Sequence, residues 1–108
     1  MDPRSRIDVL REQIGGPRDG VLLRYSLGLA LMLDGDAREA VWQFRAAVGF
    51  DPDYSAAWKL LGKACLQSGD AHAAGEAWRR GIAVAERRGD VQAAKEMRVF
   101  LKRLTPQP

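Results

Sequence analysis

The stretch LGLALMLDGDAREAVWQF, residues 27–44, decides the fold because its marker residues recur farther along the chain. The Leu-Gly pair at 27–28 returns at 61–62, and the run Gly-Asp-Ala at 35–37 returns at 69–71. The displacement is 34 residues in both cases. A repeat of this length is typical of a helix–turn–helix unit, which cannot bury its apolar face alone and stacks on a neighbouring unit. The sequence therefore predicts an all-α array of helical hairpins.

Glycine in the middle of each repeat indicates a close approach between paired helices. Gly28 and Gly62 lie within apolar helical stretches, where glycine costs about 1 kcal/mol relative to alanine. A compensating close contact is therefore expected. We expect Ala40 and Ala74 to face these glycines, small residue against small residue, with an aromatic residue four positions later filling the wider space beyond.

The recurring Gly-Asp pairs mark the turn inside each hairpin. Gly35 and Gly69 are expected to end the first helix of each unit in the left-handed conformation that glycine adopts without steric cost. Asp36 and Asp70 then cap the second helix, because a side-chain oxygen at this position accepts a hydrogen bond from an unpaired backbone N–H. Glu39 stands three residues after Asp36, as in a capping box.

The 108 residues form one predicted domain, large enough to fold without a metal or a disulfide. We divide it into a leading helix and turn at 1–20, a first unit at 21–54, a second unit at 55–88, a capping helix at 89–104 and a loose tail at 105–108. The helices are expected at about 3–14, 21–34, 38–49, 55–68, 72–88 and from 91 onward. The apolar stripe of the capping helix is Val91, Ala94, Met97, Leu101 and Leu104.

The two units resemble the tetratricopeptide repeat (TPR) family in their small and aromatic residues. The matching residues are Leu27, Gly28, Gly35, Ala40, Phe44, Ala47 and Pro52 in the first unit, and Trp58, Leu61, Gly62, Gly69, Ala74, Trp78 and Gly81 in the second. Glu86 replaces the proline of the pattern, which predicts that the last helix of the second unit continues to about Arg88. The resemblance covers about two thirds of the chain and implies an α–α superhelix, or solenoid, that binds proteins or peptides on its concave face.

The residues that carry most enzyme chemistry are scarce. His72 is the only histidine and Cys65 the only cysteine, so neither a zinc site nor a Ser-His-Asp triad is indicated. Cys65 is expected to be a buried, small apolar residue. Gly15-Gly16-Pro17 lacks the Gly-Lys-Ser/Thr ending of a phosphate-binding loop. We therefore predict a non-enzymatic protein with no catalytic residue, no metal ligand and no cofactor.

Charge is distributed unevenly along the chain. The formal net charge is +3, and the excess of basic residues lies in residues 55–108, where it can steer an anionic partner or simply form solvated helix faces. No segment has the roughly 20 apolar residues that a membrane span requires. Charged residues precede the first apolar run, which argues against a signal peptide. A cytoplasmic protein without a membrane partner is expected.

The resemblance implies a partner-binding groove lined by the first helix of each unit. The corresponding residues are Tyr25, Leu29, Met32, Lys59, Lys63 and Gln67. This half-apolar, half-basic surface suits a peptide with hydrophobic anchors beside an acidic group or a free carboxylate. The chain contains no asparagine, so the asparagine-based clamp that some members use on chaperone tails is not implied. Alternatively, Leu29 and Met32 are buried under the leading helix.

Trp42 is out of pattern, since its position two before Phe44 normally points away from the core. It marks a possible second partner-binding surface, because tryptophan is enriched at interface hot spots; packing against the leading helix or a neighbouring arginine is the alternative. Self-association of the chain is a further hypothesis. Nucleic-acid binding by the basic C-terminal half is the least favoured, because the aromatic residues are used in the predicted core instead of a stacking platform.

Overall fold

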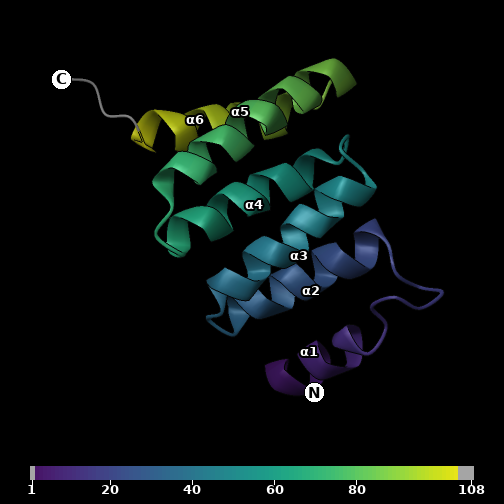
Figure 1. Ribbon diagram of the computed structural model, residues 1–108. Coiled ribbons are helices and arrows are strands. Elements are labelled where there is room, and N and C mark those ends of the chain that lie inside the picture. The colour runs from purple at the N-terminus through teal and green to yellow at the C-terminus, as the bar shows by residue number, and fades with distance from the viewer. Residues whose placement is uncertain (1, 105–108) are drawn as a thin grey trace.

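The computed structural model describes residues 2–104, which form six α-helices in sequence (Figure 1). Their bounds are α1 Pro3–Arg11, α2 Val21–Leu33, α3 Ala37–Phe50, α4 Ser55–Gln67, α5 Ala71–Arg88 and α6 Val91–Leu104. The predicted tail at 105–108 lies outside the described residues. α5 continues to Arg88, as the missing proline predicted.

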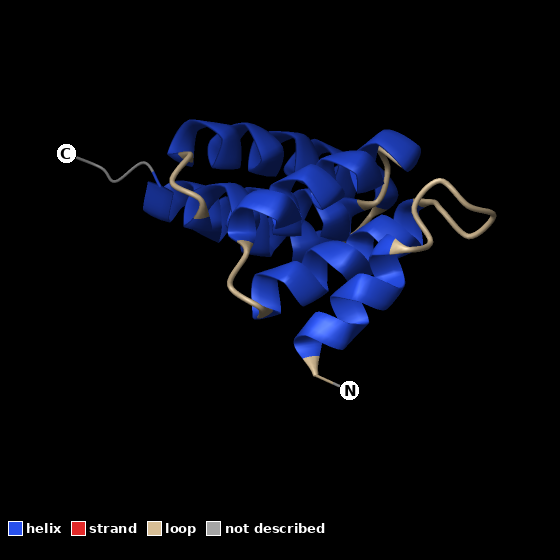
Figure 2. Ribbon diagram, turned by 60° about the horizontal axis from the view of Figure 1, so that its bottom comes forward, coloured by secondary structure: helices blue, strands red, loops and turns tan. Residues whose placement is uncertain are grey.

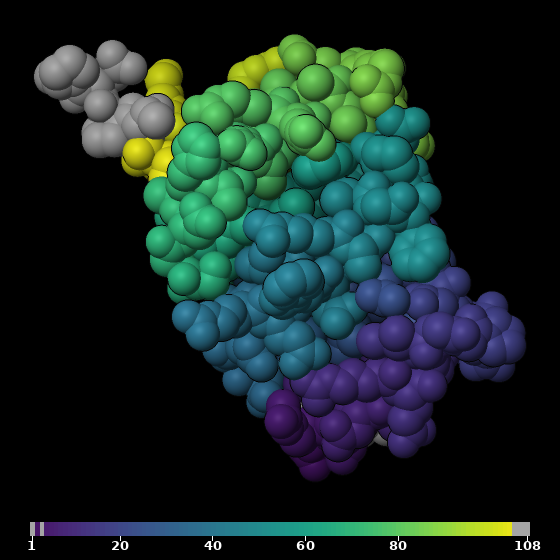
Figure 3. All heavy atoms as spheres, viewed as in Figure 1, coloured from purple at the N-terminus to yellow at the C-terminus, as the bar shows by residue number. Residues whose placement is uncertain are grey.

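The helices stack in chain order as antiparallel neighbours, so the predicted all-α hairpin array is confirmed. α2 packs most extensively on α3 and α4 on α5, and the two hairpins join through α3 and α4. The body measures 46 × 28 × 20 Å. In Figure 3, α3 and α5 are prominent on the visible face and α6 lies largely behind α5. Figure 2 shows the loop between α1 and α2 projecting from the side of this helical body.

Gly28 of α2 and Gly62 of α4 each lie directly under an aromatic ring of the paired helix. A Cβ added to Gly28 would lie 2.6 Å from the ring of Phe44, and one added to Gly62 would overlap the indole of Trp78. The nearest atoms to each added Cβ belong to the aromatic rings, so Phe44 and Trp78 approach the glycines directly instead of only filling the wider space beyond. Glycine is required here so that a large ring, not a small side chain, can fill the space between two close backbones.

The turns form as the Gly-Asp pairs predicted. Gly35 and Gly69 have φ angles of +83° and +93°, in the left-handed region that glycine occupies freely. The carboxylates of Asp36 and Asp70 accept hydrogen bonds from the backbone N–H groups three residues later, at 3.1 and 2.9 Å. The turn at 89–90 repeats both features, with Gly89 at φ +75°.

The predicted capping box is only half present. The backbone N–H of Asp36 donates to the carbonyl of Leu31 at 2.8 Å, as in a Schellman turn. The carboxylate of Glu39 instead accepts hydrogen bonds from the guanidinium of Arg11, with Arg11 Nε at 3.0 Å and Arg11 Nη2 closer still. Glu39 therefore ties α1 to α3 and does not close the cap of its own helix.

The leading helix follows the same 34-residue register, although the sequence pattern did not predict it. Asp2 caps α1 by accepting from the backbone N–H of Ser5 at 2.9 Å, and it lies 34 residues before Asp36. α1, α3 and α5 therefore begin one repeat apart, directly after a capping aspartate. α1 ends at Arg11, earlier than expected, and buries Ile7 completely. It has the place of a shortened second helix of a preceding unit.

The capping helix packs on both helices of the second hairpin. α6 contacts α5 along its length and also touches α4, so it stands where the first helix of another unit would lie. Met97 is fully buried against Gly81. Val91 does not belong to the buried stripe, since it is 73% exposed and Ala93 is buried in its place. Ala94, Met97 and Leu104 pack on the core as predicted, and Phe100 packs there where Leu101 was expected.

Candidate functional site

A pocket of about 460 Å³ lies between α4 and α6, on the face that the groove prediction indicated. Its lining is Lys63, Leu66 and Gln67 from α4, Trp78 from α5, and Phe100, Arg103 and Leu104 from α6. Two of the predicted groove residues, Lys63 and Gln67, thus lie together with residues of the capping helix that were not predicted to line the groove.

The floor of this α4/α6 pocket is apolar and held in place. Trp78 is 2% exposed, and its indole N–H donates to the carbonyl of Lys59 at 3.0 Å. The ring of Phe100 packs on it with 5.4 Å between centroids. Leu66 remains substantially exposed at the edge. Because the rings are fixed by packing and a hydrogen bond, the apolar surface exists before any ligand arrives.

Two cations lie at the rim of the α4/α6 pocket. Lys63 Nζ stands 4.8 Å from the centroid of the Phe100 ring, a cation–π geometry that positions the ammonium at the rim. Arg103 is exposed on the last turns of α6. Neither takes part in an ion pair within residues 2–104. The pocket therefore combines an apolar floor with positive charge that the described part of the chain does not neutralise.

Lys59, the third basic or polar groove residue expected on α4, forms an ion pair with α6. Its Nζ lies 3.3 Å from a carboxylate oxygen of Glu96 on α6, and both side chains are about two-thirds to three-quarters covered. This ion pair joins α4 to α6 beside the pocket. The repeat pattern does not predict this ion pair, because Glu96 lies 37 residues away on a helix outside the two predicted units.

The predicted groove residues of the first unit are partly used in packing. The ring of Tyr25 contacts those of Phe44 and Tyr54, at centroid distances of 6.0 and 5.1 Å, and burial raises the pKa of Tyr25. Leu29 and Met32 are half-buried against the core. The structure therefore separates the six predicted residues into a packed set on α2 and a pocket-lining or ion-paired set on α4.

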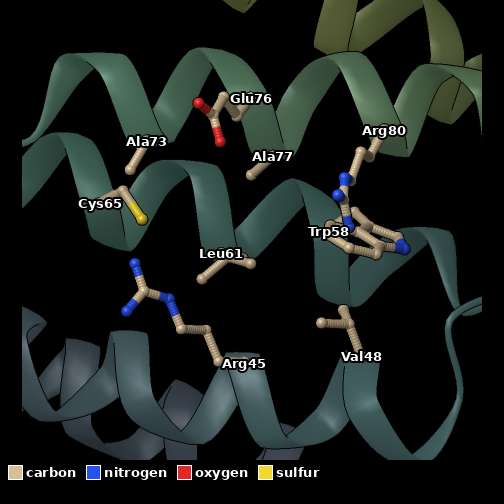
Figure 4. A pocket seen from close by; sticks show the side chains of 9 residues that line it. All are labelled: Arg45, Val48, Trp58, Leu61, Cys65, Ala73, Glu76, Ala77 and Arg80. Atoms are coloured by element: carbon tan, nitrogen blue, oxygen red, sulfur yellow. The ribbon is translucent and has the colours of Figure 1, made fainter.

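A second groove, about 280 Å³, lies between α3 and α5 with α4 as its floor (Figure 4). It is lined by Arg45, Val48, Trp58, Leu61, Cys65, Ala73, Glu76, Ala77 and Arg80. Residues 58, 61 and 65 share one face of α4 at helical spacing, whereas 59, 63 and 67 share another. The α3/α5 groove and the α4/α6 pocket are therefore separate surfaces.

Trp42, which the sequence marks as a possible second partner-binding surface, lies beside this groove. It is 68% exposed on α3, and it precedes Arg45 by three residues, so the two side chains are neighbours on the helix surface. Nothing in the sequence indicated Arg80, whose position relative to α3 depends on the packing of both hairpins. Trp42 remains a predicted contact residue.

Cys65 and His72, the two side chains with potential chemical reactivity, lie in environments typical of structural residues. Cys65 is 2% exposed at the floor of the α3/α5 groove, where burial raises the pKa of its thiol despite the nearby Arg45 guanidinium. His72 is on the surface, with Nε2 2.7 Å from a carboxylate oxygen of Glu76. Within residues 2–104 no group of three His, Cys, Asp or Glu side chains is arranged to hold a metal ion. None of the helices described has the length and apolarity to cross a membrane.

Comparison with known proteins gives relatives along nearly the whole chain. No family model matches. A Pseudomonas aeruginosa protein named TPR repeat-containing protein PA0015 is 45% identical over 98 residues, covering 91% of this chain and 93% of that protein. The solution structure of protein BPP2914 from Bordetella parapertussis has a TM-score of 0.77 at 42% identity, over 91% of this chain and 85% of that one.

The crystal structure of MamA supports the fold at lower identity. It has a TM-score of 0.72 at 21% identity, covering 97% of this chain and 70% of that chain. The family follows from the hairpin array, the glycine–aromatic contacts inside each hairpin, and the 45% identity to a TPR repeat-containing protein over 91% of this chain and 93% of that one. The chain belongs to the tetratricopeptide repeat family.

Proposed function

We propose that the chain is a non-enzymatic scaffold that binds a protein or peptide along the face formed by α2, α4 and α6. The observation that carries the proposal is the α4/α6 pocket, whose apolar floor stands beside two cations that have no carboxylate partner in the described part of the chain. Membership of the TPR family supports protein binding in general. A preformed apolar pocket with a few polar groups at its rim is the usual form of a ligand site.

The chemistry of the α4/α6 pocket favours a peptide with an apolar anchor next to an acidic group or a free carboxylate. The apolar side chain would rest on Phe100 and Leu66, above the buried ring of Trp78 against which Phe100 packs. The guanidinium of Arg103 can bind a carboxylate through two parallel hydrogen bonds, and the ammonium of Lys63 adds a point charge. Gln67 offers both a donor and an acceptor to the peptide backbone.

The test is affinity capture from a lysate of the source organism, followed by titration of the captured partner. The wild type is compared with a Lys63→Glu, Arg103→Glu double variant, in which both rim charges are reversed. A variant with Lys102→Glu is the matched control, because this exposed residue is next in sequence to Arg103 but does not line the pocket. We expect the double variant to lose the partner and the control to keep it.

Retention of the same proteins by all three forms would contradict the proposal, provided that circular dichroism shows equal helicity. Self-association is the alternative use of this face, and the exposure of Leu33 (85%) and Leu22 (68%) at the two ends of α2 favours testing it. Sedimentation velocity at several protein concentrations separates the two: a groove that binds its own copy gives a mass that rises with concentration.

A further inference from the structure

We propose that the α3/α5 groove is a second docking site, which binds an acidic amphipathic helix of a partner protein. This site lies on a different face of α4 from the α4/α6 pocket, so the proposal goes beyond the function proposed above. Apolar side chains of the partner would contact the groove floor, and its carboxylates would contact Arg45 and Arg80.

The two arginines stand on opposite walls of the groove. Figure 4 shows Arg45 extending from α3 toward Cys65 and Arg80 projecting from α5 beside Trp58. The guanidinium of Arg80 lies 5.7 Å from the centroid of the Trp58 ring, and neither arginine takes part in an ion pair within the described residues. A guanidinium stacked on an aromatic face is oriented while its N–H donors remain available for a carboxylate.

One carboxylate also lies at the rim, and its partner is on its own helix. Glu76 Oε1 is 2.7 Å from Nε2 of His72, one turn earlier on α5. The rim therefore presents two guanidinium groups against one carboxylate that already has a partner. This imbalance is complementary to a negatively charged ligand and selects against a basic one.

The floor and length of the groove suit a helix. Val48, Leu61 and Trp58 form an apolar surface between the arginines, and the lining residues of α5 extend from Ala73 to Ala77 and Arg80, about two helical turns. An α-helix laid between α3 and α5 presents residues at i, i+3, i+4 and i+7 to such a surface. The acidic residues on the flanks of this apolar stripe would reach Arg45 on one side and Arg80 on the other.

Trp42 extends the contact surface beyond the groove. Its ring is 68% exposed one turn before Arg45, on the outer side of α3, where a docked helix would cover it. Large aromatic side chains contribute strongly to binding when they become buried in an interface. Its exposure therefore has an explanation that packing within this chain does not provide.

The test is a titration of the full chain, labelled with ¹⁵N, with a synthetic helical peptide. The probe is acetylated and amidated, so it has no free terminal carboxylate, and pairs of leucine alternate with pairs of glutamate. Its counterpart has lysine in place of glutamate. We expect saturable shifts of the backbone amide signals at 42–48 and 73–80 with the acidic probe, and none with the lysine counterpart.

Charge variants distinguish binding in the α3/α5 groove from binding in the α4/α6 pocket. Arg45→Glu and Arg80→Glu should each weaken the acidic probe about tenfold or more, as expected for the loss of a charge-assisted hydrogen bond. Lys63→Glu, in the other pocket, should leave the affinity unchanged. Glu76→Gln removes the one negative charge at the rim without touching the core, so it should tighten binding about two- to threefold, and it remains informative if an arginine variant fails to fold.

Three results would overturn the proposal. The first is an acidic probe that produces no saturable shifts at 42–48 and 73–80. The second is equal binding of the lysine counterpart. The third is shifts confined to residues 63–67 and 100–104, with affinity lost in Lys63→Glu. This result would show that the probe binds in the α4/α6 pocket, and it would leave the proposed function standing.

Discussion

A single missing side chain sets the distance between the helices of each hairpin. At Gly62 the indole of Trp78 occupies the volume that a Cβ would need. The indole cannot move without cost, because it is 2% exposed and its N–H is bonded to the carbonyl of Lys59 at 3.0 Å. Glycine therefore stabilises the folded state here in spite of its poor helix propensity.

Gly62→Ala is expected to destabilise the protein. Overpacking a filled core typically costs about 1–3 kcal/mol, and alanine regains about 1 kcal/mol of helix propensity, so the free energy of unfolding should fall by up to about 2 kcal/mol. Urea unfolding followed by circular dichroism measures this difference.

Gly49→Ala is the matched control. Gly49 also lies inside a helix, α3, but an added Cβ there meets no atom within 4 Å. The same substitution should therefore leave stability unchanged or raise it by up to about 1 kcal/mol. Equal stabilities of the two variants would show that the contact with Trp78 is easily relaxed and that the close approach is not the reason for Gly62.

At the scale of the element, the loop between α1 and α2 depends on one carboxylate. Asp19 accepts hydrogen bonds from the backbone N–H groups of Gly15 and Gly20, both at 2.9 Å, and from Nε of Arg24 at 2.8 Å. The Arg24 guanidinium, followed by the hydrogen bond from Gly15, lowers the pKa of Asp19 well below its ordinary value. The carboxylate thus joins the two ends of the loop and ties the loop to the first turn of α2.

The pKa of Asp19 makes the stability of this loop depend on pH. Because the folded-state pKa is depressed, the contribution of Asp19 is fully present above the ordinary carboxyl pKa, near 4, and is lost as the pH falls below it. The difference in free energy of unfolding between wild type and Asp19→Asn should be positive at pH 7 and should shrink between about pH 4 and pH 2. Urea unfolding at several pH values measures it.

Glu12→Gln supplies the comparison for this pH series. Glu12 is an exposed carboxylate at the start of the same loop, and its substitution should give a difference from wild type that is small at every pH. If Asp19→Asn behaved in the same way, the hydrogen bonds of Asp19 would not contribute to stability, and the loop would be ordered by other contacts.

At the scale of the whole molecule, each helix packs mainly on its neighbours in the chain, so stability should vary along the array. α1 packs mainly on α2, and within residues 2–104 the ion pairs that tie it to other segments are Arg4 with Asp34 at 3.2 Å and Arg11 with Glu39 of α3. The helices in the middle pack on both sides. Opening of α1 should therefore precede global unfolding.

Hydrogen exchange should show this gradient and its dependence on one ion pair. We expect the slowest amide exchange in α3, α4 and α5 and the fastest helical exchange in α1. Arg11→Ala should raise exchange in α1 by up to about fivefold, the scale of a partly exposed ion pair, and leave α4 and α5 unchanged. An equal increase throughout the chain would show instead that the array opens as a single unit.

Features that repeat with the period of the chain were predictable, and features that depend on spatial neighbours were not. The left-handed turns at Gly35 and Gly69 follow from local chemistry. The register of α1 escaped detection because Arg6 and Leu10 stand where the two units have alanine and an aromatic residue, so only the cap recurs.

The candidate sites were predictable only in part for the same reason. Lys63 and Gln67 line the α4/α6 pocket as the family resemblance implied. The engagement of Lys59 by Glu96 and the position of Arg80 beside Trp58 arise from the packing of helices that the local pattern does not relate. Side-chain partners on three different helices depend on tertiary packing, whereas the helix positions and turns of this chain follow from the local sequence.

Because α1, α3 and α5 begin one period apart, a segment of one period could be removed from or added to the chain without disrupting a helix cap. Deleting residues 36–69 would join Gly35 directly to Asp70 and recreate an intact turn, with Gly28 brought opposite Trp78. Adding the same cassette would lengthen the array without altering either terminus. Recombination in steps of one period therefore offers evolution a way to resize the binding surface while every helix cap is preserved.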